Sequence, residues 1–145
     1  MKVAFACDHA GFALKEAVIA HLKEMGHEVV DFGCYTPERV DYPAQGEKAA
    51  RAVALGECAL GVLICGTGIG ISLAANRVHG IRAAVCSESY SAELTRRHND
   101  ANMIAFGARV VGEGTACAIL DAFFGAKFEG GRHAQRVAML DEIKP

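Results

Sequence analysis

The chain has 145 residues, of which 52% are hydrophobic and 22% are charged, a length and balance typical of one globular domain with a single core. Its net charge is only −2, tryptophan is absent and aromatic residues are few, so we expect neither a nucleic acid nor an acidic membrane surface as partner. No apolar run approaches the roughly 20 residues of a membrane-spanning helix.

Short apolar stretches alternate with longer amphipathic ones along the chain. In chain order they predict a strand at 3–7, a helix at 11–25, a strand at 28–32, a turn-rich loop at 33–43, a helix at 44–55, a strand at 60–65, a glycine loop leading into a helix that ends at 76, a strand at 81–86, a helix at 89–97, a strand at 103–106 and helices at 114–124 and 132–143. This alternation is typical of a parallel sheet covered on both faces. We therefore predict an α/β fold, a three-layer α/β/α sandwich with a five-stranded parallel Rossmann-like sheet, in one domain over residues 1–145.

Six cysteines are spread along the chain without a C-x-x-C pair or a close grouping with histidine. Several lie in apolar runs, where a reduced cysteine behaves as a small hydrophobic residue. The apolar run at the start is interrupted by Asp8 and His9 and does not have the form of a secretory signal. We therefore expect no disulfide, no metal site and a reducing, cytoplasmic location.

The glycine loop Gly66–Gly70, G-T-G-I-G, directly follows the predicted strand at 60–65. Ligands of doubly wound sheets bind beyond the carboxyl ends of the strands, and glycines there let backbone N–H groups approach an anion. The loop is not a P-loop, because no Lys-Ser/Thr pair follows it, and it fails the dinucleotide pattern, because Ile71 stands where the third glycine is required. It predicts a cradle for an anion or oxyanion, with a tight turn that binds nothing as the alternative.

Three polar residues lie at or just beyond the ends of predicted strands, at this same side of the sheet. Cys65 ends a strand against the start of a helix, a setting that favours the thiolate and suits a base or a nucleophile. The alternative is a buried structural cysteine, which is how we interpret Cys7. Asp8 and His9 are candidates for handling hydroxyl protons or binding phosphate, although Asp8 could instead cap the helix that follows.

Basic residues late in the chain are candidates for binding an anion. Arg132 and Arg136 lie four residues apart on one helix face and Arg109 follows the last strand, so the three can share one phosphate; a solvated basic face is the alternative. His98 and Asn99 end the fourth predicted helix, where a cation is commonly a partner of the helix dipole. That helix end points away from the ligand-binding edge, so His98 would act in the cleft of a neighbouring subunit or after a bend in the chain.

Eight motifs span nearly the whole chain: A-C-D-H-A-G, D-Y-P, I-C-G-T-G-I-G-I-S, A-A-N, C-S-E-S-Y-S-A, R-R-H-N-D-A-N, F-G-A-R-V-V-G and E-G-G-R-H-A-Q-R-V. In this order and spacing they resemble the type B ribose-5-phosphate isomerases of the ribose/galactose isomerase family. The resemblance implies an aldose–ketose isomerase of pentose phosphate metabolism, which interconverts ribose 5-phosphate and ribulose 5-phosphate through a cis-enediolate without a cofactor. An isomerase of a hexose 6-phosphate or tetrose 4-phosphate is the alternative, and a non-catalytic phosphate-binding module is a further one.

The resemblance also implies a role for each matching residue. Cys65 is similar to the base of the family's thiol branch, whereas other members carry a Glu at the position of Ile71 and lack the Cys. The positions that resemble the remaining catalytic residues are Thr67 for shuttling protons between sugar oxygens, and His98 with Asp8 for opening the furanose ring. The positions that resemble substrate contacts are Asp8, His9, Tyr42, Gly66, Thr67, Gly68, Ile69, Gly70, Asn99, Arg109, Arg132 and Arg136.

Within that set, the resemblance assigns the phosphate to His9, Arg109, Arg132 and Arg136. It gives Asn99 a sugar contact, Tyr42 a place in the wall of the cleft and the loop amides the developing oxyanion. It also implies a homodimer or tetramer with each site built from two subunits, which accounts for the direction of His98. Ala6 stands where many members have Gly, a departure from which we expect no functional effect.

Overall fold

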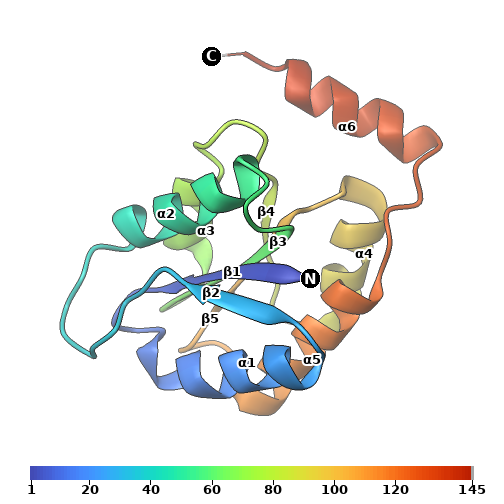
Figure 1. The fold of residues 1–145 in the computed structure, drawn as a ribbon. Helices are drawn as coiled ribbons and strands as arrows, with labels where there is room; N and C mark the ends of the chain where they lie inside the picture. The colour runs from blue at the N-terminus through green and yellow to red at the C-terminus, as the bar shows by residue number, and fades with distance from the viewer. Residues whose placement is uncertain (145) are drawn as a thin grey trace.

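The computed structural model describes residues 1–144, and it contains the five strands that the sequence predicts. The strands are β1 (Lys2–Cys7), β2 (Glu28–Asp31), β3 (Leu60–Cys65), β4 (Ala83–Val85) and β5 (Met103–Gly107). The helices are α1 (Phe12–Glu24), α2 (Tyr42–Ala54), α3 (Ile69–Ala75), α4 (Ser89–Asn99), α5 (Glu113–Gly125) and α6 (Arg132–Glu142). Figure 1 shows the strands as one central layer with helices above and below it.

The strands form one parallel sheet in the order β2-β1-β3-β5-β4. The apolar strand β3 lies at the centre and is buried along its whole length, whereas the more polar β2 lies at an edge. Parallel pairing brings the carboxyl ends of neighbouring strands together, with Cys7 opposite Ile64 and Cys65 opposite Gly107. The predicted α/β sandwich is confirmed.

The two faces of the sheet are packed with side chains of different size. Helices α1, α4 and α5 cover a face rich in large residues, including Phe5, Phe106 and Phe123. Helices α2 and α3 cover the opposite face, where alanines of β1 and α2 dominate. Small residues bring these layers close together, and a Cβ on Gly46 of α2 would lie 2.9 Å from the carbonyl oxygen of Ile71 in α3. Cys65 belongs to the buried cluster on this closely packed face.

Most predicted boundaries differ from the structure by one or two residues, and two of these differences have a clear physical reason. Helix α2 begins at Tyr42 rather than Ala44, because proline in the first turn has no N–H to lose and Asp41 enters the helix in an extended conformation. Tyr42 therefore stands on a helix and not in the preceding loop. Strand β4 covers only Ala83–Val85, since Ile81 and Arg82 lead into it without joining the ladder.

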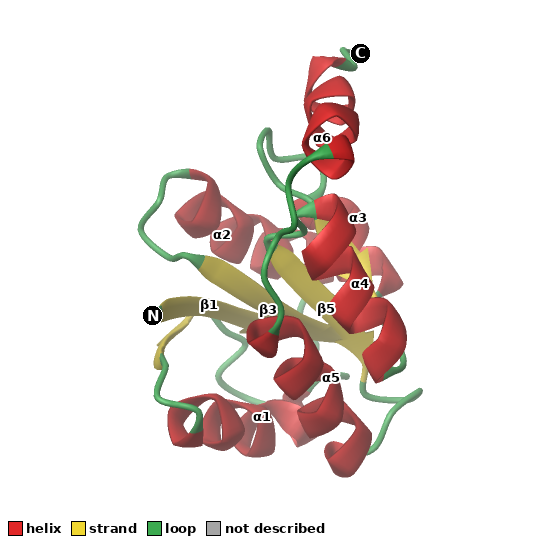
Figure 2. Cartoon of the chain, turned by 90° about the vertical axis from the view of Figure 1, so that its right-hand side faces the viewer, coloured by secondary structure: helices red, strands yellow, loops and turns green. Residues whose placement is uncertain are grey.

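Helix α6 extends away from the three layers, beyond the end of α4, in both overall views (Figures 1 and 2). Its contact with the rest of the chain is mainly to α4, and Nη1 of Arg82 donates to both carboxylate oxygens of Asp141. Met139 and Leu140 remain more than half exposed. Among residues 1–144, none of the helices combines the length and hydropathy needed to cross a membrane.

Candidate active site

Three central strands deliver polar residues to one point at the carboxyl edge of the sheet. Asp8 follows β1, Cys65 ends β3 and Arg109 follows β5. The backbone N–H of Asp8 donates to the carbonyl oxygen of Ile64 at 3.1 Å, so Asp8 and Cys65 are neighbours across the β1–β3 pair. Helix α1 leaves β1 toward one face and α3 leaves β3 toward the other, which makes this edge the topological switch point where ligands of such sheets bind.

The glycine loop turns a backbone amide onto the sulfur of Cys65. The Gly68 N–H donates to Sγ at 3.1 Å, and Cys65 is only 4% exposed. Gly68 has φ +80°, and a Cβ there would lie 2.8 Å from backbone atoms of Phe106, so only glycine fits this turn. The arrangement can therefore present a sulfur atom and a backbone amide to one bound group.

Other buried cysteines lack this setting. Burial, together with the neighbouring Cys34, raises the pKa of Cys7 to about 12, and burial raises the pKa of Cys86 to about 11. Both thiols are therefore protonated at neutral pH. Cys7 is fully buried and belongs to the large hydrophobic core, as predicted, with its sulfur 3.8 Å from that of Cys34.

Arg109 and Thr67 lie directly on the glycine loop. The Arg109 guanidinium lies over Gly66, where Nη1 would be 3.2 Å from an added Cβ, and its backbone N–H donates to the Gly66 carbonyl at 3.1 Å. The Thr67 hydroxyl oxygen accepts from the N–H of Ile69 at 3.2 Å. A positive charge and a hydroxyl are thus held within the same turn as the amides.

Tyr42, His9 and Asp8 surround this loop from the neighbouring segments. The Tyr42 ring packs on Gly70, where an added Cβ would lie 2.8 Å from the ring. His9 Nδ1 lies 3.3 Å from both backbone polar atoms of Val40, which ties it to the loop before α2. Asp8 Oδ1 accepts from the N–H groups of Ala10 and Gly11, so this carboxylate does organise the turn into α1.

The remaining candidates lie on the opposite side of the sheet, toward the amino ends of the strands. Helix α4 runs back along the strands and ends at His98 and Asn99, and only residues 100–102 separate it from the first residue of β5. A strand of five or six residues spans roughly 17–20 Å, so one chain does not bring His98 to Cys65. Arg132 and Arg136 lie farther out, on the projecting helix α6 (Figure 1).

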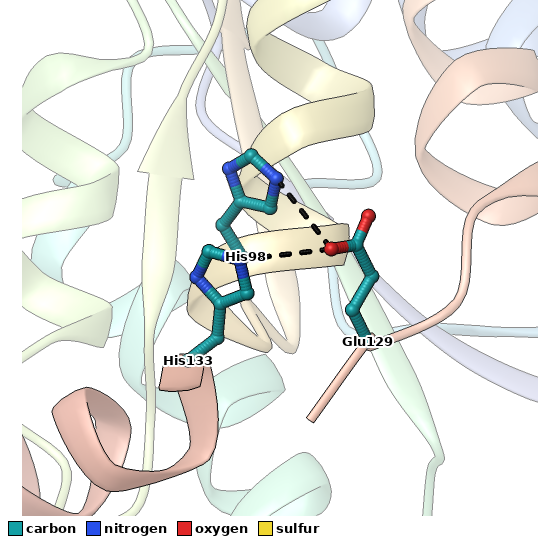
Figure 3. A group of neighbouring side chains, drawn as sticks. All are labelled: His98, Glu129 and His133. Atoms are coloured by element: carbon teal, nitrogen blue, oxygen red, sulfur yellow. Dashed lines mark ion pairs between the residues drawn. The ribbon is translucent and has the colours of Figure 1, made fainter. Parts of the chain in front are cut away.

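A cluster that the sequence reasoning missed surrounds His98 (Figure 3). Glu129 Oε2 lies 3.9 Å from His98 Nε2 and 3.6 Å from His133 Nε2, and the two imidazole rings stack at 4.2 Å with planes 7° apart. The signal was E-G-G-R-H, which puts Glu129 and His133 four residues apart across a Gly-Gly turn. Burial, followed by the neighbouring His98 and Arg132, lowers the pKa of His133 below its usual value.

This His98–Glu129–His133 cluster also has the donor atoms of a metal site, all within 4.8 Å of one another. Two features of the cluster disfavour a cation. The stacked, nearly parallel rings direct their nitrogen lone pairs side by side instead of toward one point. Glu129 Oε1 is already taken by Arg97, whose Nε donates to it at 2.7 Å, and Arg132 adds a positive charge. The geometry suits an ion-pair cluster better than a metal centre.

The family profile described as Ribose/Galactose Isomerase matches residues 3–140. The chain belongs to the ribose/galactose isomerase family. Over 143 residues it is 57% identical to ribose-5-phosphate isomerase B of Escherichia coli strain K12, covering 99% of this chain and 96% of that protein. It is 40% identical over 144 residues to galactose-6-phosphate isomerase subunit LacB of Clostridium acetobutylicum, covering 99% of this chain and 83% of the other.

Solved structures of the family have the same fold. The ribose-5-phosphate isomerase B of Clostridium thermocellum superposes with a TM-score of 0.96 at 54% identity, covering 98% of this chain and 96% of the other. The resemblance inferred from the eight motifs is therefore confirmed, and so is the fold class.

Proposed function

We infer that this chain is an aldose–ketose isomerase that interconverts ribose 5-phosphate and ribulose 5-phosphate. The observation that carries the inference is the Cys65 sulfur held at a strand end by the Gly68 amide, beside the Arg109 guanidinium. The names of the relatives agree, since the chain is 57% identical to a ribose-5-phosphate isomerase B along nearly its whole length.

The proposed chemistry moves one hydrogen as a proton. The Cys65 thiolate takes the proton from C2 of the open-chain aldose, and the electron pair of the C–H bond flows into the carbonyl to give a cis-enediolate. Amides of the loop 66–70 bind the oxygen that becomes negative, and each such donor contributes about 3 kcal/mol to transition-state stabilisation. Thr67 moves a proton from O2 to O1, and Cys65 returns its proton to C1. Because no hydride or electron is transferred, the mechanism requires no cofactor.

We propose that each site is shared by two subunits. One subunit supplies Cys65, Thr67, Asp8 and His9 with Tyr42 and Arg109, and the other supplies His98, Asn99, Arg132 and Arg136. The division is supported by the position of these two groups in one chain, because one lies at the carboxyl ends of the strands and the other at their amino ends. It is also supported by exposed apolar side chains on the elements that carry them, Ile69 and Leu73 on α3 and Met139 and Leu140 on α6. Either a homodimer or a tetramer satisfies this requirement.

In such an assembly the four basic residues His9, Arg109, Arg132 and Arg136 bind the phosphate of the substrate, which fixes the open-chain sugar relative to the sulfur. We also propose a cytoplasmic location in pentose phosphate metabolism. The six cysteines support it, since all are free thiols, including the neighbouring pair Cys7 and Cys34.

A hexose 6-phosphate is the second candidate substrate, favoured by the 40% identity to a galactose-6-phosphate isomerase subunit. The test is a panel of four-, five- and six-carbon aldose phosphates, with kcat/KM measured for each. We expect the highest kcat/KM with ribose 5-phosphate. A higher kcat/KM with a hexose 6-phosphate would change the proposed substrate but not the proposed chemistry. No turnover of any phosphosugar, together with no proton exchange, would favour the non-catalytic binding module.

A further inference from the structure

Glu129 is a residue outside the predicted site whose position is fixed by several contacts. Its backbone N–H donates to the Arg97 carbonyl at 3.0 Å, which joins the segment before α6 to the last turn of α4. Its Oε1 accepts from Arg97 Nε at 2.7 Å and pairs with Nη2 at 2.5 Å. These bonds from Arg97 lower the pKa of Glu129, so the carboxylate is charged at neutral pH.

The second oxygen of this carboxylate faces two imidazoles. Oε2 lies 3.9 Å from His98 Nε2 and 3.6 Å from His133 Nε2, too far for hydrogen bonds but close enough to attract an N–H group on either ring. Figure 3 shows both Nε2 atoms turned toward Glu129 and both Nδ1 atoms turned away. A carboxylate beside one ring nitrogen favours the tautomer with hydrogen on that nitrogen, which leaves the other nitrogen free to accept a proton.

His133 limits the rotation of the His98 ring. Its side chain is only 8% exposed, and its ring stacks flat on that of His98 at 4.2 Å. Its lowered pKa keeps it uncharged at neutral pH, so a positive charge that develops on His98 meets a neutral ring and an anionic carboxylate. The His98 imidazole thus has a fixed plane and a fixed direction.

We propose that Glu129 is a positioning residue, which orients His98 so that Nδ1 takes a proton from the sugar when the furanose ring opens. The proposal rests on the proposed function, because only a cyclic phosphosugar needs this step. The proton of the O1 hydroxyl passes to Nδ1, the C1–O1 double bond forms, and the C1–O4 bond breaks with its electron pair going to O4. His98 then delivers the same proton to O4, so the step needs no other reactant.

The test is Glu129→Gln, which keeps the shape and an oxygen for Arg97 but removes the charge. Glu93→Gln is the matched control, since Glu93 accepts from the same guanidinium at 2.9 Å while the imidazoles face Glu129. Two reactions are compared. One is conversion of ribose 5-phosphate, which is cyclic, and the other is exchange of the C1 hydrogen of ribulose 5-phosphate with D2O. Ribulose 5-phosphate is acyclic because its C5 oxygen carries the phosphate.

For Glu129→Gln we expect kcat/KM for ribose 5-phosphate to fall about tenfold to hundredfold, the usual cost of losing a residue that orients a reacting group. Exchange on ribulose 5-phosphate should stay within about twofold of wild type, because it needs the enediolate and not ring opening. Glu93→Gln should leave both rates unchanged. Nitrogen chemical shifts of His98 should show hydrogen on Nε2 in the wild type and a shift toward the Nδ1-bonded tautomer in Glu129→Gln.

Wild-type rates in Glu129→Gln, or an equal fall in both reactions, would overturn the positioning role. A wild-type protein that neither converts ribose 5-phosphate nor exchanges the hydrogen of ribulose 5-phosphate would contradict the proposed function instead. In that case the nitrogen shifts still decide whether Glu129 sets the tautomer of His98.

Discussion

Substituting Gly68 by alanine tests the turn that places an amide on the Cys65 sulfur. Gly68 has φ +80°, a conformation that costs a residue with a Cβ about 1–2 kcal/mol. The new Cβ would also lie 2.8 Å from the backbone of Phe106, which cannot rotate away, and such overpacking adds about 1–3 kcal/mol. Gly68→Ala should therefore lower the free energy of unfolding by about 2–5 kcal/mol, which lowers Tm by roughly 5–15 °C.

The same substitution should lower kcat about hundredfold, because the shifted turn moves the Gly68 N–H away from the sulfur and from the oxyanion. Gly56→Ala is the control, since Gly56 has φ +76° with open space around its Cβ position. In Gly56→Ala the free energy of unfolding should fall by only about 1–2 kcal/mol, the cost of the backbone conformation, and kcat should not change. The assays are urea unfolding at fixed protein concentration and ribose 5-phosphate turnover. If Gly68→Ala matched Gly56→Ala in both assays, the crowded turn would have no role.

Three further predictions concern the phosphate, the shared site and pH. Arg109→Gln should raise KM for ribose 5-phosphate at least about tenfold, because a charge-assisted contact to the phosphate is lost; an unchanged KM would remove Arg109 from the site. Inactive Cys65→Ala and Arg132→Ala subunits, mixed and reassembled, should recover up to about a quarter of wild-type activity, because half of the dimers then hold one intact site; no recovery would place all the residues of a site in one subunit. Because burial lowers the pKa of His133, the unfolded chain binds more protons than the folded one near pH 6.5, so stability should fall as pH drops through that value. In His133→Gln this loss of stability should be smaller, measured by urea unfolding at several pH values. A pH dependence identical to that of the wild type would show that His133 is not its source.

The residues at the carboxyl edge were predictable because they depend on local sequence. An apolar strand that ends in Cys65 and runs into glycines has few structural options, and parallel pairing then places Asp8 beside it. The contact of Tyr42 with Gly70 was harder to predict, since it depends on a helix that starts at Tyr42, two residues earlier than expected.

The cluster around His98 depends on contacts between distant segments. Glu129 and His133 are brought to α4 by the Arg97 pairs, which join residues 32 positions apart in the chain. No periodicity marks such a contact in the sequence. The separation of His98 from Cys65 was predictable, however, because a helix that returns between parallel strands must end at their amino edge.

The most direct test of the proposed chemistry is exchange of the C1 hydrogen of ribulose 5-phosphate in D2O by Cys65→Ala, with Cys7→Ala as the control. Cys7→Ala should exchange at the wild-type rate, because its thiol, with a pKa raised to about 12, takes no part in proton transfer. Cys65→Ala should bind the substrate normally and exchange about a thousandfold more slowly. Exchange by Cys65→Ala at the wild-type rate would show that another group removes the proton.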